Sequence, residues 1–313
     1  MYTRGNNSVV WADVPSALPQ VVRAEPRHIP LTGHSGAEVM LVQRDNIHFV
    51  RKTAGSRAQN ARLSEQAAKQ RGLVYCGIPF PTVLSSGVDA DGRFYFEMEY
   101  LTGRTVANII SEAMAFDPAP LMAVLSRLFD FFRLTEGPAI SAAAFEEKIV
   151  AIAACRTDGA APYEGKITTM AAHLSALNWH GIPASVCHGD LTLENIMVTE
   201  KRGLVFIDCD ACFTSSWWLD AAKLFQDLAG HWCLRDLYLQ PVESPALLNA
   251  TELLSGLAQT SRQMFASLDD DLAERLPQLA ALHLFRTVPY ATNPQVVGFV
   301  LERMVKLLAQ RGL

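Results

Sequence analysis

Three polar side chains suited to metal binding and proton handling gather around one short stretch of the sequence. Asp190 lies just before an apolar run at 195–199 that Asn195 opens, and Asp208 closes a second apolar run at 204–207. The link between the runs ends in glycine, which is typical of the turn in a β-hairpin. A hairpin brings the three side chains to the same end. One amide and two carboxylates on one rim are hard oxygen ligands of the kind that Mg²⁺ prefers.

Phosphoryl transfer needs such an arrangement, because it requires little covalent chemistry and much positioning. One carboxylate orients the attacking hydroxyl, while an Asn and a second Asp hold the metal on the phosphates. The alternative is that Asp190, Asn195 and Asp208 only cap turns and end strands, as such residues often do. Two nested motifs at this separation favour phosphoryl transfer.

The pattern His188-x-Asp190-x-x-x-x-Asn195 resembles the catalytic loop of protein kinases. Its His-Gly-Asp form is that of the aminoglycoside phosphotransferase and choline kinase family of small-molecule kinases, and Ile207-Asp208-Cys209-Asp210 is similar to the metal-binding strand end of that family. The resemblance implies that Asp190 orients the acceptor hydroxyl. It also implies that Asn195 and Asp208 hold Mg²⁺.

The same resemblance implies structural support for the loop. His188 is expected to brace it by hydrogen bonds, and Asp220 is expected to brace its backbone from the first turn of a helix. That helix is predicted to begin at Ser215 or Ser216, either of which suits an N-cap. A helix-dipole role stays open for Asp220, and Asp210 is a candidate for a further contact near the metal.

Nearer the N-terminus, a glycine-containing stretch at 31–37 precedes a predicted strand at 38–42. Glycines at Gly33 and Gly36, flanking Ser35, allow backbone amides to approach a phosphate closely. The position resembles the loop that covers the nucleotide in a kinase, although an ordinary turn stays an alternative.

The next strand, predicted at 47–52, ends in two bases. In a kinase-like fold this strand carries the cation that contacts the nucleotide phosphates. Lys52 is the choice, with Arg51 in reserve, because neighbouring residues point to opposite faces of a strand. Glu65 is the only acid of a helix predicted at 56–71, so the resemblance makes it the partner of Lys52; a solvated charge is the alternative.

Further strands are predicted at 82–88 and 93–98, and the chain then changes from strand to linker at 96–104. Met98-Glu99-Tyr100-Leu101 followed by Gly103 resembles the hinge of the family. The resemblance implies that the backbone from Glu99 to Leu101 binds the adenine edge of the nucleotide. An edge strand that ends at Gly103 is compatible with this role.

The fold class that follows is α+β: a bilobal protein-kinase-like fold with a small β-rich N-lobe containing one helix, and a larger, mainly α-helical C-lobe. We expect the N-lobe over residues 1–100 and the C-lobe over 101–313. Helical periodicity continues through most of the C-lobe, with helices predicted at 105–115, 118–134, 142–155, 164–179, 245–267, 272–286 and 294–310.

Composition limits the function classes. The chain of 313 residues is 50% hydrophobic, so it can bury a large core, and its net charge of -5 gives no basic excess for nucleic acid. We expect no nucleic-acid partner, no membrane span and a cytoplasmic location; the oligomeric state stays open. The six cysteines show no disulfide spacing, and a zinc set of Cys209, Cys212, His231 and Cys233 is a minor alternative.

The expected ligands are therefore ATP (or GTP), Mg²⁺ and a small hydroxyl-bearing acceptor. Between residues 211 and 313 there are ten acids against eight bases. A site for polycationic aminoglycosides needs more carboxylates, because desolvating ammonium groups without partners is costly. A sugar or sugar-containing metabolite is thus favoured. A protein-directed kinase or toxin, and a nucleotide-binding pseudokinase serving as an interaction module, are the alternatives.

Overall fold

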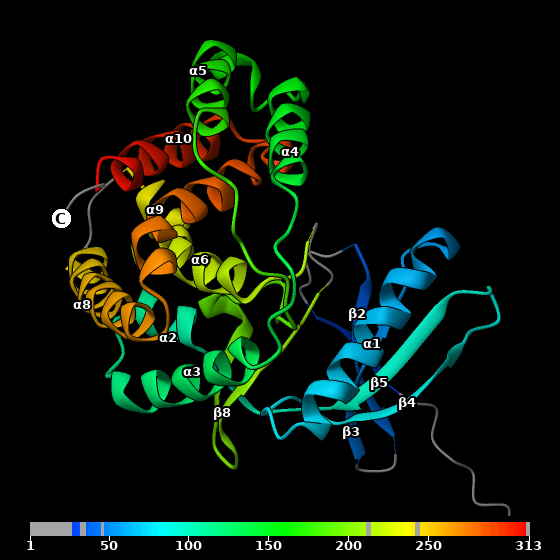
Figure 1. The fold of residues 1–313 in the computed structure, drawn as a ribbon. Helices are drawn as coiled ribbons and strands as arrows, with labels where there is room; N and C mark the ends of the chain where they lie inside the picture. The colour runs from blue at the N-terminus through cyan, green and yellow to red at the C-terminus, as the bar shows by residue number, and fades with distance from the viewer. Residues whose placement is uncertain (1–26, 32–35, 45–46, 211–213, 242–244, 311–313) are drawn as a thin grey trace, which may run out of the picture.

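The N-terminal part of the protein is a twisted antiparallel sheet with one helix against it (Figure 1). A computed structural model describes residues 27–31, 36–44, 47–210, 214–241 and 245–310. The sheet has the strand order β1-β2-β3-β5-β4. Its strands and their helix are β1 (Arg27–Pro30), β2 (Glu38–Arg44), β3 (Ile47–Thr53), β4 (Val83–Val88), β5 (Phe94–Glu99) and α1 (Asn60–Tyr75).

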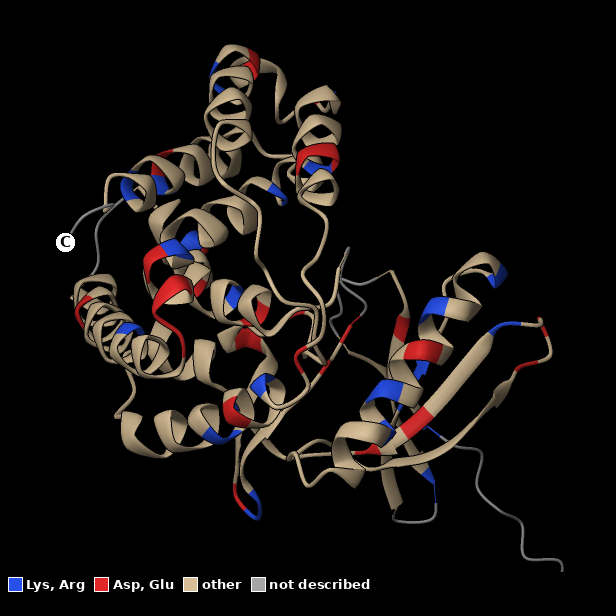
Figure 2. Ribbon diagram, in the orientation of Figure 1, with Lys and Arg blue, Asp and Glu red and all other residues tan. Residues whose placement is uncertain are grey.

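Helix α1 begins and ends about four residues later than the sequence predicts, since it starts at Asn60 and continues through Gly72 to Tyr75. A glycine inside a helix costs about 1 kcal/mol relative to alanine. Here the extra turn buries Leu73, only 3% exposed, in the core of the helical lobe, which offsets that cost. The turn that ends the helix uses Gly77, whose φ is +80°. Along α1 the charged positions are mostly basic, with one acidic position among them (Figure 2).

The expected hairpin is present, and a third strand joins it. Strands β7 (Ile196–Thr199) and β8 (Gly203–Phe206) pair with β6 (Gly103–Thr105) in the order β6-β7-β8. A Cβ on Gly103 would lie 2.3 Å from the carbonyl oxygen of Val198, so the close approach of these strands requires glycine there. The linker that follows β5 therefore leads directly into the sheet that carries the catalytic hairpin.

The rest of the chain is helical and packs around α6, which lies at the centre of the lobe (Figure 1). Ser216 caps α6 by accepting a hydrogen bond from the Trp218 backbone N–H, as predicted. The helices are α2 (Val106–Ser111), α3 (Pro118–Arg133), α4 (Ala142–Ala154), α5 (Glu164–Ser175), α6 (Trp217–Leu228), α7 (Arg235–Tyr238), α8 (Pro245–Leu268), α9 (Asp270–Phe285) and α10 (Pro294–Leu308). Short 3₁₀ turns are η1 (Arg57–Gln59), η2 (Ala161–Tyr163), η3 (Leu193–Asn195), η4 (Trp232–Leu234) and η5 (Val288–Tyr290).

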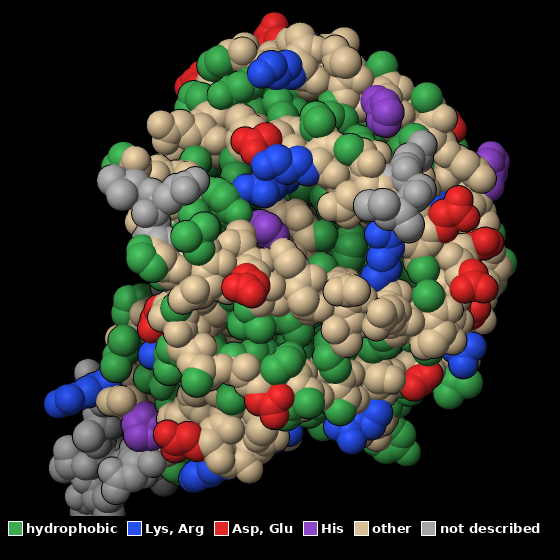
Figure 3. Space-filling view, turned by 90° about the vertical axis from the view of Figure 1, so that its left-hand side faces the viewer, with side chains coloured by type: hydrophobic (Ala, Val, Ile, Leu, Met, Phe, Trp, Pro, Cys, Tyr) green, Lys and Arg blue, Asp and Glu red, His purple; other side chains and the backbone are tan. Residues whose placement is uncertain are grey.

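The predicted fold class is confirmed: a small antiparallel β lobe with one α-helix is followed by a larger helical lobe. The outer face of the helical lobe carries charges of both signs among apolar side chains (Figure 3). Among the described helices, none combines the length and the apolar character needed to cross a membrane.

Candidate active site

The catalytic loop and the end of β8 pack backbone against backbone. Gly189 has a φ of +95°, and a Cβ at this position would lie 1.9 Å from the carbonyl oxygen of Asp210. The Asp210 N–H donates to the carbonyl oxygen of His188 over 3.0 Å. The glycine of the His-Gly-Asp motif is therefore required both by its conformation and by this contact.

His188 is a buried brace, as the resemblance implies. Its side chain stacks on Phe80, with ring centroids 5.4 Å apart. Its Nε2 lies 3.0 Å from the Ile207 carbonyl oxygen, and its Nδ1 accepts from the Asp190 N–H over 3.2 Å. Burial lowers the pKa of His188 to about 4, so the ring is neutral. The contacts of its two nitrogens favour one tautomer of the ring and hold the loop against it.

Two aspartates of α6 hold the backbone of the loop. Asp220 accepts hydrogen bonds from the N–H groups of His188 and Gly189, the second over 2.8 Å. Asp227, two turns further along, accepts from the Leu193 N–H over 2.7 Å. Burial raises the pKa of the Asp220 carboxyl well above its ordinary range, and burial raises that of Asp227 to about 7. The expected bracing contact of Asp220 is present, and Asp227 adds a second one.

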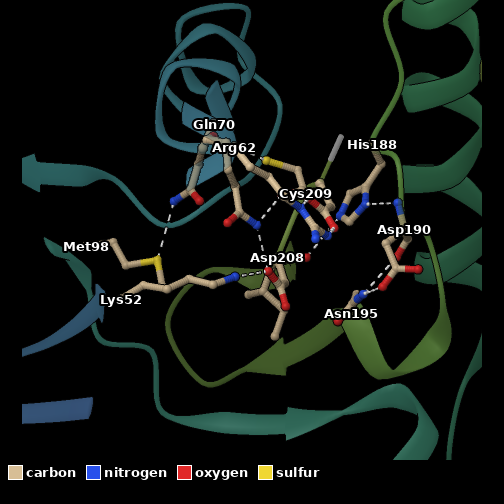
Figure 4. Close-up of polar contacts among 12 residues, drawn as sticks. Lys52, Arg62, Gln70, Met98, His188, Asp190, Asn195, Asp208 and Cys209 are labelled. Carbon is tan, nitrogen blue, oxygen red and sulfur yellow. Dashed lines mark hydrogen bonds and ion pairs between the residues drawn. The ribbon is translucent and has the colours of Figure 1, made fainter. Parts of the chain in front are cut away.

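Both carboxylate oxygens of Asp190 are engaged, and Figure 4 shows the contact with Asn195. The Asn195 Nδ2 donates to Asp190 Oδ2 over 2.9 Å and to its backbone oxygen over 2.8 Å. The ammonium of Lys223 lies 3.2 Å from Asp190 Oδ1. The Asp190 side chain is 41% exposed, so it remains accessible to an acceptor hydroxyl. The amide of Asn195 directs its N–H₂ to Asp190, which leaves its carbonyl oxygen for a metal ion.

Asp208 faces Asp190 across the site and meets the N-lobe. The Lys52 Nζ lies 2.5 Å from Asp208 Oδ1, and the Gln66 Nε2 donates to the same oxygen over 2.8 Å. Asp208 has a φ of +58°, a left-handed conformation that aspartate tolerates better than most residues. The structure therefore brings the predicted phosphate-binding lysine and the predicted metal ligand together.

The choice of Lys52 over Arg51 agrees with the contacts of both side chains. Lys52 is only 3% exposed and reaches Asp208. Arg51 lies on the other face of β3 and forms an ion pair with its cross-strand neighbour Glu97. The expected pairing of Lys52 with Glu65 differs from the contacts in the structure, because Glu65 points to solvent. Gln66 takes the inward position on α1, where it is 5% exposed.

The model of the phosphotransferase enzyme family, APH, matches residues 30–234 of this sequence, about two thirds of the chain. This chain belongs to that family. Its members are kinases that act on hydroxyl groups of small molecules. No curated protein matches the sequence.

Solved structures with the same fold include proteins named as a fructosamine-3-kinase and an aminoglycoside phosphotransferase. A protein named as a fructosamine-3-kinase of Haemophilus somnus 129PT is 12% identical, with a TM-score of 0.52 over 90% of this chain and 91% of that one. A thermostable mutant of aminoglycoside phosphotransferase APH(4)-Ia, in complex with ADP and hygromycin B, is 13% identical, with a TM-score of 0.53 over 93% and 95%. At such identities the likeness concerns the fold alone.

In the stretch expected to cover the nucleotide, Gly33 and Ser35 lie outside the described residues. Gly36 has a φ of +74° and contacts Gly55. A Cβ on Gly55 would lie 2.2 Å from the carbonyl oxygen of Gly36. At the hinge, Glu99 donates its N–H to Thr82 over 2.9 Å. Its carboxylate binds Arg202 of the β7–β8 turn over 2.6 Å, so the linker is tied to the hairpin.

The alternative zinc set gains nothing from the structure. Cys212 lies outside the described residues, and burial raises the pKa of the Cys209 thiol to about 12. A thiol in that environment stays protonated, whereas zinc binds the thiolate. The neighbouring Asp210 is engaged by α1 through an ion pair with Arg62 and a 2.7 Å bond from Lys69 to its backbone oxygen.

Three functional positions escaped the sequence analysis: Gln66, Lys223 and Asp227. Each lies on a helix whose rotation about its axis decides which residue faces the cleft, and sequence periodicity fixes that rotation poorly. One signal was present for two of them. Lys223 and Asp227 fall three and seven residues after Asp220, on the same face of one helix.

Proposed function

We propose that the protein is an ATP- (or GTP-) and Mg²⁺-dependent kinase that phosphorylates a hydroxyl of a sugar or sugar-containing metabolite. The observation that carries the proposal is the arrangement of Asp190, Asn195 and Asp208 around one opening, with Lys52 on the nucleotide side. Asp190 would accept a hydrogen bond from the acceptor hydroxyl and take its proton as the phosphoryl group passes from the nucleotide to the hydroxyl oxygen. Lys52 would bind the nucleotide phosphates.

The donor set fits Mg²⁺. Asp208 offers a carboxylate that is 38% exposed, and Asn195 offers an amide oxygen turned away from Asp190. Mg²⁺ commonly takes one or two protein oxygens and fills its other positions with phosphate oxygens and water. When bound, the metal would neutralise charge on the phosphates; the residues that hold it would be Asn195 and Asp208.

The division of labour follows the two lobes. We assign residues 1–100 to an N-lobe that covers the nucleotide through Gly33, Ser35 and Gly36, and residues 101–313 to a C-lobe that binds the acceptor. The backbone from Glu99 to Leu101 would contact the adenine edge. The nucleotide ligands of APH(4)-Ia, which are ADP in one complex and AMP-PNP in another, support an adenine nucleotide.

The charge beside Asp190 supports a neutral acceptor. Among the described residues, Asp190 forms an ion pair with Lys223. The positive charge of this lysine disfavours a second ammonium group next to the reacting hydroxyl. The neighbouring acid Glu194 is occupied by Arg235 over 2.8 Å. An aromatic ring can stack on the apolar face of a sugar only where it is exposed. Trp217 and Trp218 are buried in the core, whereas Tyr290 is 81% exposed.

The experiment is a panel of acceptors assayed with Mg·ATP by ADP release, confirmed by mass spectrometry of the product. Neutral sugars and glycosides form one arm, and aminoglycosides form the other. We expect efficient phosphorylation in the neutral arm. Salt-sensitive phosphorylation confined to aminoglycosides would refute the acceptor assignment, and Mg·ATP binding without turnover on any acceptor would favour a pseudokinase.

A further inference from the structure

Helix α6 presents one face to the catalytic loop. Asp220, Lys223 and Asp227 follow one another at spacings of three and four residues, so they share that face. Both aspartates are fully buried and bind loop backbone N–H groups. Every residue of α6 except Lys223 is buried. The lysine is thus the one side chain of the helix that reaches the surface of the site.

The surroundings of Lys223 direct it to Asp190. Its side chain is 17% exposed, and its ammonium lies 3.2 Å from Asp190 Oδ1. His283 of α9 also interacts with Lys223; it is fully buried, and its pKa is lowered chiefly by burial and further by Arg286 and Lys223. A neutral histidine offers the lysine no counter-charge. The buried carboxylate of Asp227 also interacts electrostatically with Lys223, but Asp190 is the carboxylate within ion-pair distance of its ammonium.

The two oxygens of Asp190 are held from different elements. Lys223 of α6 binds Oδ1, and Asn195, at the end of the loop, binds Oδ2 over 2.9 Å. Two fixed oxygens define the plane of the carboxylate, and each oxygen retains a lone pair for a further donor. An acceptor hydroxyl can then approach a base whose orientation is already set, which reduces the cost of alignment in the transition state.

We propose that Lys223 is a positioning residue of the phosphotransfer reaction, which fixes the carboxylate of Asp190 toward the acceptor hydroxyl. The inference rests on the proposed role of Asp190. A purely structural ion pair would contribute little here, because pairs with one partner this exposed are weak. An inhibitory contact is the opposite possibility, in which Lys223 competes with the hydroxyl for Oδ1.

The test compares Lys223→Met, which keeps the length of the side chain without its charge, with Lys223→Arg. Lys306→Met is the matched control, since Lys306 is exposed and paired with Glu302 on α10. Turnover is measured with Mg·ATP and the best acceptor of the panel, or as ADP release with water as acceptor. We expect Lys223→Met to lower kcat by about 10- to 100-fold, with acceptor KM and Mg·ATP Kd within about twofold, and Lys223→Arg to recover most of the loss.

A double-mutant cycle isolates the route through Asp190. In an Asp190→Asn background, Lys223→Met should change turnover by less than about twofold, because residues that act as a unit are not additive. Unchanged or higher kcat in Lys223→Met, a raised acceptor KM with normal kcat, equal losses in the Met and Arg variants, or an additive cycle would each overturn the proposal. The acceptor panel uses the wild-type protein alone. If the proposed function is wrong, the wild type phosphorylates none of the expected acceptors, and this is seen before any variant is compared.

Discussion

At the scale of single residues, each of the two carboxylates pairs with a lysine and accepts a hydrogen bond from an amide. Asp190 pairs with Lys223 and accepts from Asn195. Asp208 pairs with Lys52 and accepts from Gln66. If Asp208 and Lys52 have the roles proposed above, binding of Mg·ATP would replace the ammonium on Asp208 with the metal and move Lys52 to the phosphates. Asp190 would keep its contacts in that step. The two carboxylates are thus expected to respond differently to substitution.

Asp190→Asn tests the role in catalysis. The carboxamide keeps the size of the side chain and an oxygen for Asn195 or Lys223, but it cannot take the hydroxyl proton. Turnover should fall by roughly two to four orders of magnitude, the span for removal of a positioned acid-base group. Melting temperature and Mg·ATP affinity should stay near wild type. Turnover close to wild type would end the assignment of Asp190.

Asp208→Ala tests the metal. Mg²⁺-dependent ATP binding should weaken by about 10- to 100-fold, because the alanine removes one of the proposed protein ligands. Metal-free ATP should bind as well as before or slightly better, since Lys52 no longer leaves an ion pair. Calorimetry with and without Mg²⁺ measures both. Equal losses in the two conditions would indicate a folding defect instead.

At the scale of elements, the sequence predicts the parts that are bounded by local signals. The hairpin, the Ser216 cap and the antiparallel strands have turn residues or alternation that identify them. Strand β6 is too short to show alternation, and its pairing with β7 depends on a partner more than ninety residues away. The resemblance favours Glu65 as the partner of Lys52 because it is the only acid of the predicted helix, but the rotation of α1 places Gln66 inward.

Helix α6 carries a pH-sensitive brace. Its Asp227 has a pKa raised from 3.8 to about 7, mainly by burial and then by Glu194. The folded state therefore binds this proton more tightly than the unfolded state, and the resulting stability is present at low pH and lost as the pH rises through about 7. Asp227→Asn keeps an oxygen for the Leu193 N–H and removes the titration.

The variant should gain stability over wild type by about 2 kcal/mol more at pH 8 than at pH 5. Thermal or urea unfolding of both proteins at the two pH values measures the difference. Asp236→Asn, an exposed acid on α7, is the control and should show no such change. A pH-independent difference for Asp227→Asn would mean that Asp227 stays ionised in the folded protein.

At the scale of the whole molecule, α1 connects the lobes through one face. Arg62 binds Asp210, Gln66 binds Asp208 and the Cys209 backbone oxygen, and Lys69 binds the Asp210 backbone oxygen. All four contacts end on the segment after β8 that is proposed to hold the metal. These contacts tie the N-lobe to the proposed metal ligand, in addition to the covalent hinge.

Two neighbouring residues of α1 separate this coupling from the pairing expected from the family. Gln66→Ala removes the amide that donates to Asp208 and to the buried backbone oxygen of Cys209, which should cost about 1–3 kcal/mol of stability. Mg·ATP binding should weaken by about tenfold, because Asp208 loses its support. Glu65→Ala, one position away and exposed, should change both by little. Unfolding curves and calorimetry with Mg·ATP measure the pair. A larger loss of affinity in Glu65→Ala than in Gln66→Ala would show that Lys52 exchanges Asp208 for Glu65 when nucleotide binds, and that α1 rotates as the lobes close.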